Sequence, residues 1–264
     1  MKIAILYICT GKYECFFEGF YNSMEKYFLD GIADKFYFVW TDSEEILKTT
    51  NTNVKAIRRE CQGFPKDSLF RFSLFKTVEE DLRQFDYVYF FNSNAEIKQS
   101  VGEDILPDDT GLVAAEWPGR WMPFKHPMFY PYERNKKSTA YIPHNKGTYI
   151  YYMGGINGGK SNEYIKMIDT LASNIDDDYE CGIVAIVHDE SHINKYLSDH
   201  SCKVLKPQYC WPEEWGTVIS PLIVFRDKSA FGKYFDISKG RKHPFLRKAK
   251  KFVRVMANAV RWYL

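Results

Sequence analysis

The stretch YVYFFNSNAEI, Tyr87 to Ile97, predicts a buried β-strand that stops abruptly on small polar residues. Its first five residues are apolar or aromatic, and Asn92, Ser93 and Asn94 follow them. Asn accepts left-handed backbone conformations and bonds nearby main-chain groups, so N-x-N after a strand is typical of a turn. Ligands of open α/β sheets, however, bind just outside the carboxyl ends of the strands. The same two amides are therefore candidates for contact with a substrate.

The segments on either side alternate between strand and helix patterns. Apolar runs predict strands at residues 2–8, 35–40, 53–59, 87–91, 111–117 and 148–154. Apolar residues at helical spacing predict helices at residues 17–28, 66–85 and 162–175. The second of these helices is expected to begin with Asp67 or Ser68 as its N-cap. This order favours an α/β fold with a mixed, mainly parallel sheet covered by helices.

The composition indicates a globular protein. The chain of 264 residues is long enough for one large domain or two small ones. Aromatic residues make up 17% of it, and Tyr and Trp suit surfaces that pack against sugar rings. The six cysteines show no C-x-x-C or zinc-finger spacing, so we expect reduced thiols and a cytoplasmic protein. The opening MKIAILYICTGKYE lacks a signal-peptide cleavage site and is interpreted as a first strand.

Positive charge is concentrated at the C-terminal end. Between Lys239 and Leu264 there are nine Lys or Arg and no Asp or Glu, so the net charge of +2 leaves −7 on the remainder. An apolar stripe at helical spacing runs along this segment, through Phe245, Ala249, Phe252, Met256, Val260 and Tyr263. A basic amphipathic helix is typical of attachment to an anionic membrane surface, although a solvated tail or a helix docked on the body would show the same pattern. A nucleic-acid partner is not expected, because no recognition motif is present and the rest of the chain is acidic.

Two further segments carry chemically informative residues. YIYYMGGINGG places Gly154, Gly155 and two more glycines after a predicted strand, which favours either a tight turn or close approach to a ligand. The run AIVHDESHINKYL brings His188, Asp189 and Glu190 to a strand-to-helix junction. Burying adjacent ionisable groups costs free energy unless they form pairs or take part in binding or catalysis. Carboxylates at this position also cap helix N-termini. No H-E-x-x-H motif is present, so zinc binding is not favoured.

In their order along the chain, these segments resemble glycosyltransferase family six. That family comprises the retaining α-1,3-galactosyl- and N-acetylgalactosaminyltransferases that include the ABO blood-group enzymes, and the likeness is greatest to its bacterial members. The matching segments, from about residue 2 to 228, are CTGKY, FVWTDS, DSLFRF, YVYFFNSNAE, HPMFY, YERNKKSTAYIP, YYMGGINGG, VHDESHINKYL and LKPQYCWPEEW. The resemblance implies a GT-A type, Rossmann-like nucleotide-sugar-binding domain over residues 1–238, followed by a basic amphipathic tail at residues 239–264.

The resemblance also gives a role to the strand that ends on two asparagines. Vertebrate members carry D-x-D here, which holds manganese against the nucleotide-sugar diphosphate, whereas bacterial members carry N-x-N. An amide is a weak, neutral ligand for such a cation. We therefore expect Asn92 and Asn94 to bond the donor with no metal ion and no cofactor. Basic residues, Lys228 or Lys233 in this chain, would stabilise the leaving UDP.

Other roles carry over by the same resemblance, position by position. Glu190 matches the catalytic carboxylate, which either attacks the anomeric carbon or stabilises an oxocarbenium-like ion. The remaining donor-binding residues are expected to be Ile8, Cys9, Thr10, Tyr13, Arg71, Met153, Gly154, Gly155, His188 and Asp189. The expected acceptor-binding residues are His126, Trp211 and Glu213. Val187 stands where the family usually has Trp before H-D-E, which removes a stacking face.

The resemblance implies transfer of N-acetylgalactosamine, or galactose, from the UDP-sugar in α-1,3 linkage to a galactoside that carries fucose. Gly155 leaves room for an acetamido group, whereas Met153 is typical of galactose users. A bacterial member is expected to build a blood-group-like antigen on lipopolysaccharide or a lipid-linked glycan, at the inner face of the cytoplasmic membrane. Two other classes stay open: a metal-dependent transferase that recruits its ion through Asp86 or Glu96, and a non-catalytic, membrane-attached sugar-binding module.

Overall fold

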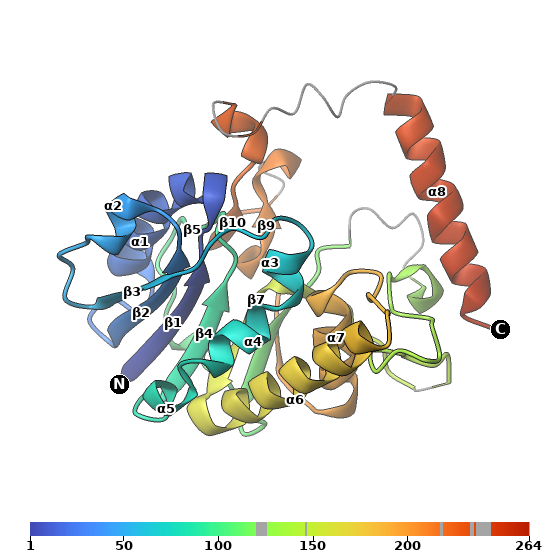
Figure 1. Cartoon of the computed structure of the whole chain (residues 1–264), viewed down its shortest axis with the longest axis horizontal. Coiled ribbons are helices and arrows are strands. Elements are labelled where there is room, and N and C mark those ends of the chain that lie inside the picture. Colours follow the sequence, from blue (N-terminus) through green and yellow to red (C-terminus); the bar gives the residue numbers. More distant parts are fainter. Residues whose placement is uncertain (120–125, 146, 217–218, 233–234, 236–243, 264) are drawn as a thin grey trace.

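A seven-stranded sheet forms the centre of the molecule, in the order β3-β2-β1-β4-β7-β6-β8 (Figure 1). The computed structural model describes residues 1–119, 126–145, 147–216, 219–232, 235 and 244–263. The strands are β1 Lys2–Ile8, β2 Asp34–Thr41, β3 Val54–Arg58, β4 Tyr87–Phe91, β6 Leu112–Glu116, β7 Tyr152–Lys160 and β8 Lys203–Leu205. Strand β7 is antiparallel to β4 and β6, and the other neighbouring pairs are parallel. The mixed, mainly parallel sheet predicted from the sequence is confirmed.

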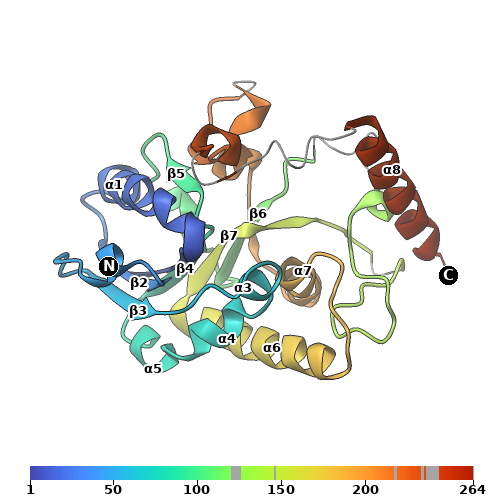
Figure 2. The same cartoon turned by 45° about the horizontal axis from the view of Figure 1, so that its top comes forward.

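Helices cover both faces of this sheet (Figure 2). The helices are α1 Phe17–Tyr27, α2 Glu44–Leu47, α3 Lys66–Leu69, α4 Arg71–Lys76, α5 Glu79–Leu82, α6 Ser161–Glu180, α7 Asp189–Asp199 and α8 Pro244–Arg261. Helix α1 packs on one face, and α4, α6 and α7 pack on the other. Strand β1 supplies both cores because alternate side chains point to opposite faces: Ile3 and Ile5 pack with α1, and Ala4 and Leu6 pack with the other layer.

A smaller sheet and short 3-10 segments complete the described part of the fold. The sheet has the order β5-β10-β9, formed by Ala95–Ile97, Ile223–Phe225 and Trp211–Pro212. The 3-10 turns are η1 Gly11–Phe16, η2 Glu103–Ile105, η3 Pro127–Phe129, η4 Pro207–Tyr209, η5 Glu213–Trp215 and η6 Lys228–Phe231. Strand β5 starts directly after Asn94, so the small sheet is built onto the carboxyl end of β4.

The glycines of YYMGGINGG lie inside strand β7, so a turn after the predicted strand at residues 148–154 is wrong. A Cβ on Gly158 would stand 2.4 Å from the Tyr89 ring, and one on Gly159 would stand 2.5 Å from the Gly111 carbonyl oxygen. Neighbouring strands therefore approach β7 too closely for any side chain at these two positions. Gly158 and Gly159 thus serve close packing in a buried strand, which the sequence alone does not distinguish from a turn.

The helix predicted at residues 66–85 is broken into α3, α4 and α5. Asp67 and Ser68 are not N-caps, because α3 begins after Pro65 without a side-chain cap. The Asp67 carboxylate instead accepts main-chain N–H groups of Gln62 at 3.0 Å and Gly63 at 2.8 Å. The Asp67 side chain thus bonds the main chain of the preceding loop and does not cap the helix.

Helix α8 confirms the helical pattern at the C-terminal end, but its predicted apolar stripe faces outward. Phe252, Val260 and Tyr263 are more than half exposed, at 58%, 54% and 58%. A different face, including Ala259 and Trp262, is buried against the body. Among the described helices, none is long and apolar enough to cross a bilayer. All six cysteines are free thiols.

Candidate active site

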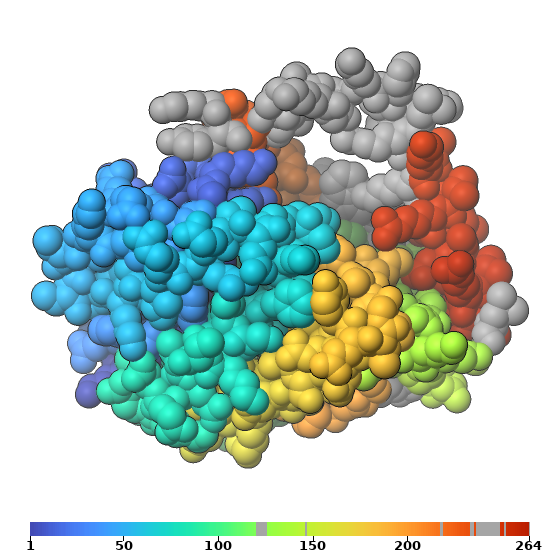
Figure 3. All heavy atoms as spheres, in the orientation of Figure 1, coloured from blue at the N-terminus to red at the C-terminus, as the bar shows by residue number. Residues whose placement is uncertain are grey.

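A cavity of about 560 Å³ opens at the edge of the large sheet where β1 and β4 end and β7 begins. Its described lining comes from five parts of the chain: Phe64, Ser68 and Arg71; Asn92; Met153, Gly154 and Gly155; Ile186, Val187, His188, Asp189 and Glu190; and Arg254. Figure 3 shows the surface hollowed between the segment around α3, in cyan, and α8, in red. Seven of the predicted donor-site residues and the predicted catalytic carboxylate therefore line one cavity.

Glu190 is held at this cavity by two donors from β7 and the residue before it. The Tyr151 hydroxyl donates to one carboxylate oxygen, and the Gly154 N–H donates to the other at 2.7 Å. Burial raises the pKa of Glu190, while these two hydrogen bonds and the nearby Arg71 act to lower it. The carboxylate is thus fixed in position without a direct ion pair among the described residues, which suits a group that must face developing positive charge.

Asp189, the neighbouring carboxylate, is arranged differently. It forms a buried ion pair with Arg71, and both side chains are less than a tenth exposed. Arg71 also lies over the Phe90 ring, 4.3 Å from its centroid, and burial lowers the pKa of its guanidinium to about 10. The pair anchors the start of α7 to the start of α4, and so positions Glu190 beside β7.

His188 has a strained backbone at the cavity. Its φ of 54° and ψ of −130° lie in a region that a side chain rarely adopts. The imidazole packs edge-on against Phe64, with ring centroids 4.8 Å apart, and burial lowers the pKa of His188. The Nδ1 atom is buried with no hydrogen-bond partner among the described residues.

Asn92 and Asn94 bond each other across the end of β4. The Asn92 amide donates to Oδ1 of Asn94 at 3.1 Å, and the Asn94 amide donates to the main-chain oxygen of Arg226 at 2.9 Å. The Asn92 N–H donates to the Gly155 carbonyl oxygen at 2.8 Å. The pair is neutral and held by local contacts, and Asn92 faces the cavity.

These residues do not fit a tight divalent-cation site. The Asn94 side-chain oxygen already accepts a hydrogen bond, and an amide supplies no charge to a hard cation. Asp86 accepts the Lys2 N–H at the opposite end of β4, and Glu96 is paired with Lys98 and Arg226. Within the described ranges, no group of three or more His, Cys, Asp or Glu side chains is placed to hold a metal.

The remaining predicted donor residues gather near the end of β1. Tyr7 pairs with Phe91, so residues 8–10 and 92–94 leave neighbouring strands side by side. Lys228 lies next to Tyr13, since its Nζ donates to the tyrosine hydroxyl at 3.1 Å. Cys9 and Thr10 are buried. Lys233 lies outside the described residues.

The three predicted acceptor residues do not belong to the described lining of the cavity. His126 is exposed, and its Nδ1 accepts the Met128 N–H at 3.2 Å at the start of η3. Trp211 is buried, and its ring N–H donates to the Gly216 carbonyl oxygen at 2.8 Å. Glu213 pairs with Arg226 at 3.0 Å. The acceptor roles stay predictions. The side chains of Trp211 and Glu213 already bond Gly216 and Arg226, so they would have to bind an acceptor in addition to these contacts.

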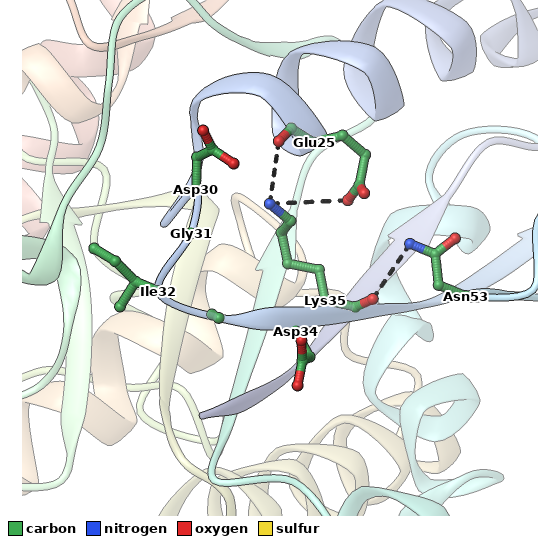
Figure 4. A pocket seen from close by; sticks show the side chains of 8 residues that line it. Glu25, Asp30, Gly31, Ile32, Asp34, Lys35 and Asn53 are labelled. Carbon is green, nitrogen blue, oxygen red and sulfur yellow. Dashed lines mark hydrogen bonds and ion pairs between the residues drawn. The ribbon is translucent and has the colours of Figure 1, made fainter.

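A second cavity, of about 510 Å³, lies at the amino end of β2 and is shown in Figure 4. Its Lys35 donates to the main-chain oxygens of Glu25 at 3.3 Å and Phe28 at 3.0 Å, and it forms an ion pair with Glu25 at 3.9 Å. Asn53 donates to the Lys35 carbonyl oxygen at 3.3 Å. These groups hold α1 and β2 together, so the cavity beside Glu190 is the better candidate active site.

The sequence profile of Glycosyltransferase family 6 matches residues 1–228, which covers most of the chain. The chain belongs to glycosyltransferase family 6. Among family relatives, the O-antigen biosynthesis glycosyltransferase WbnI of Escherichia coli is 35% identical over 241 residues, which cover 90% of this chain and 100% of WbnI. The α/β architecture with its mainly parallel mixed sheet agrees with the GT-A fold expected of this family.

More distant family 6 relatives come from mammals. Histo-blood group ABO system transferase 1 of Rattus norvegicus is 29% identical, over 83% of this chain and 64% of the relative. Globoside alpha-1,3-N-acetylgalactosaminyltransferase 1 of Mus musculus is 26% identical, over 81% of this chain and 62% of the relative. The chain therefore spans less than two thirds of the length of these mammalian relatives.

Two residues that organise the candidate site were not predicted from the sequence. Tyr151 donates to the Glu190 carboxylate. Asn194, one helical turn after Glu190, donates to the main-chain oxygens of Glu190 and Tyr152, each at 2.9 Å, and accepts the Tyr152 N–H at 2.8 Å. Asn194 could have been predicted, because residues four apart in a helix lie on the same face and Asn194 follows Glu190 by four residues in α7. Tyr151 lies 39 residues from Glu190, and no local pattern connects them.

Proposed function

We propose that the enzyme is a retaining transferase that moves N-acetylgalactosamine, or galactose, from a UDP-sugar in α-1,3 linkage to a galactoside, without a metal ion. The observation that carries this proposal is Glu190, which lines the cavity and is fixed there by hydrogen bonds from Tyr151 and Gly154. Family membership and the activity named for the globoside alpha-1,3-N-acetylgalactosaminyltransferase relative support the sugar and the linkage.

In the proposed reaction, Glu190 faces the anomeric carbon while its bond to UDP breaks. The carboxylate either attacks that carbon or stabilises the oxocarbenium-like ion while the acceptor hydroxyl approaches from the side that UDP leaves. The leaving diphosphate gains negative charge. Lys228 beside Tyr13, and Lys233 further along, are the cations proposed to stabilise it, while Asn92 and Asn94 bond the donor as neutral groups.

Release of UDP, measured with and without EDTA, tests the proposal. UDP-N-acetylgalactosamine and UDP-galactose would each be offered with a fucosylated galactoside. Activity that persists in EDTA supports the proposed reaction. Loss of activity in EDTA would favour a metal-dependent transferase, and no turnover with any donor would favour a non-catalytic sugar-binding module.

The donor preference proposed from Gly155 has a structural complication. Gly155 lines the cavity, but a Cβ on it would stand 2.6 Å from the Phe225 ring and 3.3 Å from the Met153 methyl group. Absence of a side chain there is therefore required by packing as well. We keep N-acetylgalactosamine as the favoured donor, and the ratio of UDP release from the two donors checks it.

We further propose that the outward face of α8 lies on the anionic inner surface of the cytoplasmic membrane, where a lipid-linked or lipopolysaccharide acceptor would be met. The name of the WbnI relative, which refers to O-antigen biosynthesis, supports a surface glycan as acceptor. Phe252, Val253 and Val260 are exposed by 58%, 65% and 54% on this helix. Each basic residue near such a surface contributes roughly 1 kcal/mol before screening, and the apolar side chains add burial.

Sedimentation with anionic liposomes over a salt series tests this attachment. We expect weaker binding by Phe252→Ser and Val260→Ser, and by a chain that ends near Gly240. Val184→Ser, at an exposed valine of the body, is the matched control. The point variants are needed because the shortened chain also loses the docked residue Trp262. Equal binding by the wild type and all variants would contradict the attachment.

A further inference from the structure

Helix α8 is docked on the body next to the cavity, beyond the residues that match the family profile. Trp262 is buried, lies 5.0 Å from Tyr149 between ring centroids, and stacks beneath the Arg134 guanidinium, which is 3.6 Å from its centroid. Asn258 is also buried, and its amide donates to the Tyr132 carbonyl oxygen at 3.4 Å. Figure 1 shows the helix alongside the loops that follow β6. These contacts fix which face of α8 points toward the site.

A groove of about 220 Å³ runs between α8 and the body. Its described lining is Phe129, Pro131, Ile186, Val187, Arg254, Val255 and Asn258. Ile186, Val187 and Arg254 line this groove and the Glu190 cavity as well, so the two spaces adjoin at these residues. A substrate that reaches Glu190 can therefore extend into the groove along the side of α8.

Arg254 is the cation at the junction of the two spaces. It forms no ion pair with any carboxylate of the described residues, whereas Asp189 is already paired with Arg71. Its positive charge acts on His188, whose pKa it helps to lower. Arg254 is exposed, so its guanidinium is free to meet an anionic ligand at the groove, and a charge-assisted hydrogen bond is stronger than a neutral one.

We propose that the groove is an acceptor subsite for one acidic sugar next to the reacting galactoside, with Arg254 binding its carboxylate. The proposal rests on the proposed function, because it extends the same acceptor. Phe129, Pro131 and Val255 contact the faces of the sugar ring, and Arg254 meets the carboxylate at the junction.

Size and charge favour a sugar acid over a diphosphate. The groove is smaller than the roughly 300–1,000 Å³ of pockets for drug-sized ligands, so it suits a single ring. Its described lining offers one guanidinium, whose planar pair of donors matches a carboxylate. A diphosphate carries more charge than this site balances, and part of it would stay unpaired against apolar side chains.

Two matched disaccharides test the subsite: galactose linked to glucuronic acid, and galactose linked to glucose. Turnover of each would be measured by UDP release, and binding of each by calorimetry in the presence of UDP. We expect the wild type to favour the acidic disaccharide by about tenfold in kcat/KM and in affinity. Arg254→Gln should remove this preference and leave the KM for the UDP-sugar unchanged. Arg254→Lys should retain part of the preference, and Arg261→Gln, on an exposed part of the same helix, should retain all of it.

Three results would overturn the subsite. They are no preference in the wild type, equal losses with both disaccharides in Arg254→Gln, and a raised KM for the UDP-sugar, which would place Arg254 at the donor. Failure of the proposed function looks different. In that case no galactoside causes UDP release, and the calorimetric affinities alone test the subsite. Tighter binding of the acidic disaccharide that depends on Arg254 supports the subsite, and equal binding of the two disaccharides overturns it.

Discussion

Two pairs of side chains at one cavity are held in opposite ways. Asn92, Asp189 and Glu190 line the cavity, and Asn94 bonds Asn92. Asn92 and Asn94 are neutral, bond each other and take their other contacts from nearby main chain. Asp189 and Glu190 are ionisable, and their partners Arg71 and Tyr151 come from 118 and 39 residues away in the sequence. The amide pair is thus locally stable, whereas the carboxylate pair depends on the assembled fold.

The difference shows where charge is used in this site. A carboxylate without an ion pair is costly to bury, and burial raises the pKa of Glu190 accordingly. The amide pair carries no such cost and provides hydrogen bonds instead. We infer that the site concentrates its electrostatic effect on the reacting carbon and binds the donor at the strand end with neutral groups. The following variants test this comparison, in order of decreasing expected effect on transfer.

Glu190→Gln should reduce transfer by about a thousandfold or more, because it removes the negative charge beside the reacting carbon. UDP binding, measured by calorimetry, should be unchanged. Glu180→Gln, at the end of α6, is the control. Turnover at the wild-type level in Glu190→Gln would assign the catalytic role to another residue.

The same variant should fold at least as stably as the wild type at pH 8. Burial raises the pKa of folded Glu190, so its proton is bound more tightly in the folded than in the unfolded chain. The raised pKa therefore adds to the folding stability of the wild type, relative to Glu190→Gln, at pH values below the pKa of Glu190 in the unfolded chain. This added stability is lost as the pH rises through the pKa of Glu190 in the folded chain. Thermal unfolding at pH 4 and pH 8 measures the trend, and a melting temperature lower than the wild type at pH 8 would show that the charge stabilises the fold.

Tyr151→Phe should lower transfer by about tenfold to a hundredfold, since Glu190 loses one of its two donors. The lost hydrogen bond favoured the ionised carboxylate, so the pKa of Glu190 should rise further. The acid limb of the kcat profile should then move to higher pH. Tyr179→Phe, at an exposed tyrosine, is the control; an unmoved acid limb would mean that Tyr151 does not tune this carboxylate.

Asn92→Asp combined with Asn94→Asp should lower transfer in EDTA by about tenfold and make it respond to added manganese. Two carboxylates would repel each other where the amides now bond, and the carboxylate that replaces the Asn94 amide cannot donate to the Arg226 carbonyl oxygen. A cation between them would relieve the repulsion. Asn51→Asp is the exposed control. Activity in EDTA equal to that of the wild type would show that the neutral pair is not needed.

Gly155→Ala should affect transfer least, by about threefold or less, and mainly lower stability. Its methyl group would press on the Phe225 ring of the small sheet, and such overpacking costs about 1–3 kcal/mol in the free energy of unfolding. Gly19→Ala is the control, because a Cβ there meets no atom within 4 Å. Denaturant unfolding measures the loss, and a large change in donor ratio without a loss of stability would favour a direct role in sugar selection.

The sequence predicted the elements whose signals are local. Strand β1 was predicted with its bounds, and α1 and α6 followed from apolar residues at helical spacing. Burial of one face imposes this spacing wherever the element packs, so the pattern is visible without knowing the partner. The end of β4 at Phe91 and the placement of Asp189 and Glu190 at the start of a helix were also predicted, but the strand expected before His188 is wrong, because residues 183–188 form loop and turns.

Only the tertiary structure decided features whose partners are distant in the sequence. The glycines of β7 lie inside a strand because Tyr89 and Gly111 approach them, and Glu190 is held by Tyr151. The apolar stripe on the outward face of α8 could be recognised in the sequence. The face that docks on the body could not, because Trp262 packs against Arg134, which lies 128 residues earlier. Residue spacing encodes which side chains share a face of one element. The free energy that pairs two elements depends on which surfaces meet, and only the assembled fold determines that.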